Sequence, residues 1–280
     1  MSAPIRLGIS TCPNDTFAFH ALLQGEVDAE GLAFETRLLD VEELNLGMAR
    51  GAFDVAKLSF ATMLRHTREL VLLPAGCALG FGVGPVVLAR PGLDTDALDL
   101  ADQRVLAPGA GTTATLLWRL FHDQPAALEQ RVFHAILPAL AAGEADLGVC
   151  IHEGRFSYAA LGLELFEDLG STWEAATGAP LPLGGIAARA GLPAEQRAKV
   201  ARVIRRSIEW ARANPAATIP TMARYAQDQS TETHFQHVEL YVNDWTVELG
   251  ARGAEAIRAL SRRAAARGLG PAEGLAVQAP

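Results

Sequence analysis

The sequence predicts an α/β fold of two lobes, and three observations support this prediction. Strand-like and helix-like segments alternate from the N-terminus, which is typical of βαβ units with a mainly parallel sheet. A glycine-rich stretch at residues 80–84 separates two apolar runs and suits a crossover between lobes. The chain has 280 residues, which exceeds a typical single domain and is enough for two lobes with cores of their own.

The periodicity of apolar residues gives the elements in order along the chain. Strands are predicted at residues 6–10, 34–39, 53–59, 70–74, 85–89, 104–107, 131–136, 146–151 and 183–189. Helices are predicted at residues 14–23, 41–50, 114–122, 137–142, 194–213, 216–227, 231–241 and 247–267. We expect the late helices to pack back on the first lobe, which then comprises residues 1–89 and 180–280, with residues 90–179 in the second lobe.

Turn and capping residues support these boundaries. Asn14 or Asp15 could cap the first helix, and Gly25 suits its C-terminal end. Gly51 follows the second helix, where a left-handed residue is favoured, and Asn214-Pro215 breaks the helical run near the C-terminus.

Two short segments resemble each other. Residues 51–56 and 143–148 share the order helix, glycine, two residues, aspartate and an apolar strand. Chance explains so short a match about as well as an internal repeat does. If the repeat is real, each lobe has an equivalent strand whose carboxyl end points at a shared cleft.

Composition excludes several classes of function. The net charge is −8 and no basic block occurs, so a nucleic-acid partner is not expected. No apolar run approaches the roughly 18 residues that span a bilayer, and the N-terminus lacks the pattern of a signal peptide, which favours the cytoplasm. Cys12, Cys77 and Cys150 show no metal-binding spacing, so we expect neither a disulfide nor a zinc site, and Cys12 is interpreted as a small buried side chain.

Three candidate ligand-binding segments follow predicted strands, where open α/β sheets bind their ligands. Asn14 and Asp15 lie where a strand turns into a helix, whose amides favour an anion, although simple helix capping explains them equally well. Residues 57–59 offer an ammonium and a hydroxyl to a carboxylate, unless Lys57 only reaches solvent. Residues 109–113 place glycines and two hydroxyls before a helix, without the lysine of a P-loop.

His152 is the fourth candidate, and it carries the most specific chemistry. It directly follows a predicted strand and precedes Glu153, Arg155 and Tyr158, so an imidazole with a charged neighbour is expected at the strand's carboxyl end. Such a histidine can take up a proton near neutral pH. A lone histidine is also a common structural hydrogen-bonding group, and both interpretations stay open on the residues alone. His234 and His237 are three apart on a predicted helix, but no third metal ligand accompanies them.

Several of these segments resemble the 1,4-dihydroxy-6-naphthoate synthase family of the futalosine pathway of menaquinone biosynthesis. The similarity extends from the first strand to Asn243 and rests on Cys12-Pro13-Asn14-Asp15-Thr16-Phe17, Asp40-Val41-Glu42, Lys57-Leu58-Ser59, Gly82-Val83-Gly84-Pro85, Thr112-Thr113, Ile151-His152-Glu153 and Leu181-Pro182-Leu183-Gly184. The resemblance implies a two-lobed fold of the type II periplasmic-binding-protein kind, with a ligand cleft between the lobes. It also implies a carbon-carbon lyase that converts cyclic dehypoxanthinyl futalosine to 1,4-dihydroxy-6-naphthoate with no metal or organic cofactor.

Site residues follow from the same resemblance. His152 is expected to be the general base, and the substrate-binding residues are expected to be Lys57, Leu58, Ser59, Thr112, Thr113 and, by extrapolation, Asn14, Asp15 and Arg155. The expected partner is a small carboxylated substrate, and the oligomeric state is left open. Two rival functions are considered: chorismate dehydratase of the same pathway, and a non-catalytic solute-binding protein, which the histidine and the absence of a signal peptide disfavour.

Overall fold

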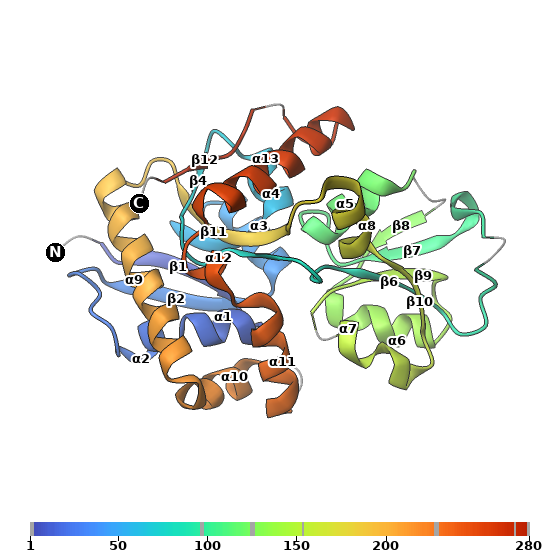
Figure 1. Cartoon of the computed structure of the whole chain (residues 1–280), viewed down its shortest axis with the longest axis horizontal. Coiled ribbons are helices and arrows are strands. Elements are labelled where there is room, and N and C mark those ends of the chain that lie inside the picture. The colour runs from blue at the N-terminus through green and yellow to red at the C-terminus, as the bar shows by residue number, and fades with distance from the viewer. Residues whose placement is uncertain are drawn as a thin grey trace.

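The computed structural model of the chain describes residues 3–95, 98–123, 127–152, 154–226, 230–271 and 273–278, and it shows two lobes, each built on one β-sheet (Figure 1). The first sheet has the order β12-β4-β11-β3-β1-β2, with β5 paired to β11. Its strands are β1 (Ile5–Ser10), β2 (Phe34–Leu39), β3 (Val55–Ser59), β4 (Leu70–Leu72), β5 (Ala78–Gly80), β11 (Leu181–Arg189) and β12 (Ala276–Val277).

The second sheet has the order β10-β6-β9-β7-β8. Its strands are β6 (Val86–Ala89), β7 (Arg104–Ala107), β8 (Ala127–Gln130), β9 (Leu147–Cys150) and β10 (Glu164–Asp168). The predicted lobe boundary after residue 89 leaves β6 with the first lobe, whereas the backbone of β6 pairs with β9 and β10. The chain therefore changes sheets between β5 and β6, and it returns between β10 and β11.

Helices cover both sheets, and those near the C-terminus pack on the first lobe (Figure 1). Their bounds are α1 (Pro13–Ala18), α2 (His20–Gln24), α3 (Val41–Ala49), α4 (Phe60–Arg65), α5 (Thr113–Phe121), α6 (Ile136–Ala141), α7 (Gly154–Ser157), α8 (Leu169–Thr177), α9 (Ala194–Ala213), α10 (Ile219–Tyr225), α11 (Thr231–Tyr241), α12 (Asp244–Val247) and α13 (Gly250–Ala266). No helix within these described residues is long and apolar enough to cross a membrane.

Four local predictions need correction. The strand expected at residues 131–136 lies at β8 instead, because β8 pairs residue for residue with β7 and the partner strand ends at Ala107. The helix expected at residues 247–267 begins only at Gly250, the first residue of α13, which has a φ of +60°, while Val247 ends the separate short helix α12. The helix expected at residues 216–227 begins as a 3₁₀ turn over residues 215–218, and residue 227 lies outside the described part of the chain. Neither Asn14 nor Asp15 caps the first helix, whose N-cap is Cys12 with a proline at the first helical position.

The crossover at residues 80–84 joins the two sheets, as its glycines predict. Gly84 has a φ of +136°, and a Cβ there would lie 2.9 Å from the Cα of Gly170 at the start of α8. The backbone of the connecting segment therefore approaches the helix more closely than any side chain at this position allows.

The two segments of the predicted internal repeat make equivalent hydrogen bonds. Asp54 precedes β3 and accepts the backbone N–H of Arg6 at 3.0 Å, and Asp146 precedes β9 and accepts the backbone N–H of Arg104 at 3.0 Å. Each of these strands pairs in parallel with an earlier strand of its sheet, β3 with β1 and β9 with β7. The guanidinium of Arg6 also holds the pKa of the Asp54 carboxyl below its usual value. The carboxyl ends of β3 and β9 are consequently equivalent positions in the two lobes.

Candidate active site

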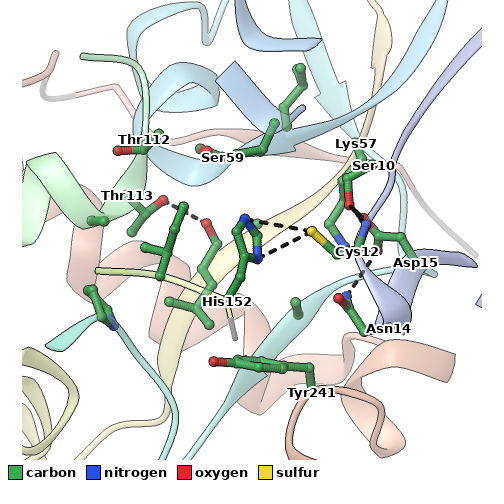
Figure 2. A pocket seen from close by; sticks show the side chains of 18 of the residues that line it. Ser10, Cys12, Asn14, Asp15, Lys57, Ser59, Thr112, Thr113, His152 and Tyr241 are labelled. Atoms are coloured by element: carbon green, nitrogen blue, oxygen red, sulfur yellow. Dashed lines mark hydrogen bonds and ion pairs between the residues drawn. The ribbon is translucent and has the colours of Figure 1, made fainter. Parts of the chain in front are cut away.

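A cavity of about 100 Å³ opens between the lobes, and the segments predicted to bind a ligand meet there (Figure 2). Its polar wall comes from the ends of β1, β3 and β9 and from the N-terminal residues of α1 and α5. Apolar and aromatic side chains complete the lining: Val41, Leu58, Ala78, Pro85, Ala114, Ile151, Leu183 and Tyr241. Such a lining suits a flat ligand with polar groups at a few defined positions.

His152 stands at the carboxyl end of β9 and lines the cavity. Its φ is +57°, a conformation that non-glycine residues seldom adopt, and backbone strain of this kind is concentrated at functional sites. The imidazole meets the thiol of Cys12 from the other lobe, with Sγ 3.2 Å from Nδ1 and 3.6 Å from Nε2, and packs edge-on against Phe133 at a centroid distance of 4.7 Å. Glu153, expected as its charged neighbour, lies outside the described residues.

Lys57 and Asp15 form an ion pair in the wall of the cavity. The Lys57 Nζ donates to Asp15 Oδ1 at 2.7 Å and to the carbonyl oxygen of Gly76 at 3.2 Å, and both side chains are over nine-tenths buried. Asp15 also accepts hydrogen bonds from the Ser10 hydroxyl at 2.6 Å and from the Asn14 amide at 3.1 Å. Lys57 does not reach solvent, because its ammonium is buried and pairs with Asp15. A contact between Lys57 and a carboxylate of the ligand stays a prediction.

The next residues of β3 lie beside the ion pair. Leu58 is fully buried and contributes an apolar contact surface, while the Ser59 hydroxyl accepts a hydrogen bond from the Asn45 amide at 3.2 Å. The other end of the Asn45 amide accepts the Ser59 backbone N–H at 3.0 Å. Ser59 is thus held by two hydrogen bonds, and its hydroxyl proton can be donated to a ligand.

Thr112 and Thr113 reach the cavity from the second lobe, and their hydroxyls already have partners. Thr112 is the N-cap of α5, and its hydroxyl donates to the Gly109 carbonyl at 2.8 Å. The Thr113 hydroxyl donates to the Leu183 carbonyl of β11 at 2.6 Å and accepts the Ala61 backbone N–H at 3.3 Å, so it links the second lobe to the first.

Glu42 of α3 makes another contact between the lobes. Its carboxylate accepts the backbone N–H of Gly111 at 2.9 Å and the Asn45 amide at 2.9 Å. Thr62 adds a hydrogen bond from its hydroxyl to the Gly111 carbonyl at 2.9 Å. The glycine loop expected to hold a ligand carboxylate therefore holds a carboxylate of the protein itself, and this contact joins the two lobes.

Replacing Glu42 with alanine should favour the open arrangement of the lobes. The variant loses two hydrogen bonds made by a charged acceptor, which are stronger than neutral ones. We expect a larger radius of gyration for the ligand-free variant in small-angle X-ray scattering and a Kd for ligand raised about tenfold. Glu43→Ala, at an exposed position of the same helix, is the control, and equal scattering by both variants would contradict this role for Glu42.

Arg155 is the one predicted site residue that does not line the cavity. Its guanidinium donates to Asp168 Oδ2 at 2.6 Å and to the Gly84 carbonyl at 3.0 Å. Gly84 lies in the crossover to the second sheet, and Asp168 is the last residue of β10. The prediction of a substrate contact is therefore not supported, and Arg155 joins the start of α7 to the crossover.

Sequence reasoning missed the lining residues His237 and Tyr241, whereas Ser10 and Cys12 belong to the candidate segment between the first predicted strand and helix. Cys12 is 8% exposed, as a small buried side chain should be, but it also contacts the imidazole of His152. The spacing of four between His237 and Tyr241 placed them on one face of a helix, and α11 turns that face to the cavity. The described residues contain no cluster of histidine, cysteine or carboxylate side chains able to hold a metal ion.

The arrangement suits proton transfer at a bound organic acid. An imidazole and a thiol meet at one end of the cavity, and hydroxyl, amide and apolar groups lie along its wall. A positioned base is more effective in such surroundings because the reacting groups are held in place and poorly solvated.

Comparison with known proteins identifies the family of the chain. A family model described as menaquinone biosynthesis matches residues 5–266. A relative from Streptomyces coelicolor, named 1,4-dihydroxy-6-naphthoate synthase, is 42% identical over 276 residues and 96% of each chain, and one of the same name from Thermus thermophilus is 41% identical over 265 residues and 95% of each chain.

Solved structures show the fold independently. The alkanesulfonate-binding protein SsuA from Xanthomonas axonopodis pv. citri superimposes with a TM-score of 0.69 at 15% identity, over 99% of this chain and 98% of that one. This likeness confirms the predicted two-lobed fold of the periplasmic-binding-protein kind. Together with the family match over nearly the whole sequence, it shows that the chain belongs to the menaquinone biosynthesis family.

Proposed function

We propose that this protein converts cyclic dehypoxanthinyl futalosine to 1,4-dihydroxy-6-naphthoate as a carbon-carbon lyase of the futalosine pathway, in the cytoplasm, with His152 as the general base. One observation carries the proposal: in a member of this family, a strained histidine faces the cavity between the lobes at the end of β9. The relatives named 1,4-dihydroxy-6-naphthoate synthase support the choice of reaction.

The chemistry of the reaction fits the residues of the cavity. Formation of an aromatic naphthoate from a cyclic precursor requires loss of an acidic proton and cleavage of the bond to the sugar-derived fragment. His152 removes the proton, and closure of the lobes holds the substrate against it. The apolar lining accommodates the ring system, while Ser59 and Asn14 offer hydrogen bonds to polar groups. We propose that the chain divides into a discontinuous first lobe and an inserted second lobe, and that movement of one lobe against the other produces this closure.

Incubation of the purified protein with three samples tests the proposal. These are cyclic dehypoxanthinyl futalosine, chorismate and buffer alone, with products identified by mass spectrometry. The proposal predicts 1,4-dihydroxy-6-naphthoate from the first sample only. Dehydration of chorismate would favour the dehydratase, and a ligand bound but left unchanged would favour a solute-binding protein. Heat-denatured protein is the control for spontaneous breakdown.

A further inference from the structure

His237 of α11 is a polar side chain without a protein partner in the wall of the cavity. The residue is 1% exposed, and neither Nδ1 nor Nε2 has a hydrogen bond to the described residues. It lines the cavity, with its ring centroid 6.2 Å from that of His152 and 4.5 Å from that of Tyr241. An imidazole always presents two hydrogen-bonding nitrogens, and burying both unpaired is unfavourable. The imidazole of His237 is therefore suited to form hydrogen bonds with a bound ligand.

The surroundings of His237 keep its ring uncharged. Burial lowers its pKa well below the usual value, and the nearby His152, His234 and Lys57 lower it further. When His152 takes up a proton, His237 consequently stays neutral. A neutral imidazole has one N–H donor and one lone-pair acceptor, a pairing that complements an oxygen able to accept, to donate or to do both.

We propose that His237 is a substrate-positioning residue that binds an uncharged oxygen of the substrate, a hydroxyl or a carbonyl, next to the atom from which His152 removes a proton. This inference rests on the proposed function, since it names a contact within the same site. The two histidines then have different roles. His152 changes its charge during the reaction, whereas His237 positions the substrate and stays uncharged.

Leucine and glutamine at position 237 test the inference. His237→Leu removes both hydrogen-bonding atoms, and His237→Gln restores a donor and an acceptor. We expect the Leu variant to bind 1,4-dihydroxy-6-naphthoate about tenfold more weakly in titration calorimetry, and the Gln variant to recover part of the loss. KM should rise by a similar factor, while the pH at which kcat is half-maximal should stay unchanged, because the base is intact. His234→Leu, a buried residue of the same helix outside the cavity lining, is the matched control and should leave product binding unchanged.

Thermal unfolding of the ligand-free variants separates binding from structure. An unpaired polar group in an apolar wall does not stabilise the fold, so His237→Leu should melt at the same temperature as the parent protein or higher. A lower melting temperature together with unchanged product affinity would overturn the inference in favour of a structural role. The proposed function fails separately, if the parent protein leaves cyclic dehypoxanthinyl futalosine unchanged.

Discussion

Replacement of His152 with asparagine is expected to lower kcat by about 10²–10⁴-fold, the contribution typical of a general base, while product binding changes little. The choice of asparagine follows from the backbone: at a φ of +57° it is among the residues that tolerate the left-handed region best. The variant therefore removes the proposed proton acceptor without adding strain. Stopped-flow or steady-state measurement of naphthoate formation gives kcat, and calorimetry with the product gives the Kd.

Cys12→Ala is the companion variant, because the thiol is the polar contact of the His152 ring. If the thiol only orients the imidazole, its removal should cost much less activity than loss of the ring itself. Turnover of His152→Asn at the parental rate would remove His152 from the mechanism. A comparable loss in both variants would instead make the thiol and the imidazole a functional unit.

Asp15→Ala is expected to lower the free energy of unfolding by about 3–5 kcal/mol, the largest effect on stability that we predict. Among the described residues, the substitution leaves the buried Lys57 ammonium with the Gly76 carbonyl as its remaining hydrogen-bond partner. An uncompensated charge in such a place is costly, because the protein replaces little of the solvation that the charge has in water. Urea unfolding at neutral pH, followed by tryptophan fluorescence, measures the change.

Lys57→Met in the Asp15→Ala background should restore much of the lost stability, since no charge then remains unpaired. The cycle of single and double variants isolates the coupling between the two side chains. The exposed pair of Arg68 and Glu273 is the control, and its removal should leave stability nearly unchanged, because exposed pairs are screened by solvent. Additive effects of Asp15→Ala and Lys57→Met would show that the two charges do not interact.

The fold was largely predictable because its elements are periodic and short connections separate them. The bounds of α9 agree with the predicted residues 194–213, since the apolar spacing is sustained over five turns. The strand predicted at residues 131–136 is wrong, because the alternation of exposed and less exposed side chains there resembles that of a strand. The position of β8 depends instead on the length of its neighbour β7. Pairing between strands is a tertiary constraint, so single-sequence patterns do not contain it.

The candidate site was predictable where a residue follows a strand, and less so elsewhere. Lys57 and His152 reach the cavity because the carboxyl ends of β3 and β9 meet there, as the internal repeat suggested. The pairing of Lys57 with Asp15 and of Cys12 with His152 joins residues 42 and 140 positions apart. The sequence holds no signal for such encounters, and none for the turn of α11 that brings His237 to the wall.

The carboxylate of Glu42 on the amide of Gly111 also bears on how fast a ligand can enter. This hydrogen bond ties the two lobes together beside the cavity, so we expect ligand capture to be limited by how often the lobes separate. The observed association rate should then level off as ligand concentration rises, at the frequency of opening, and remain far below the diffusional limit. Glu42→Ala, which removes this hydrogen bond, should raise the limiting association rate.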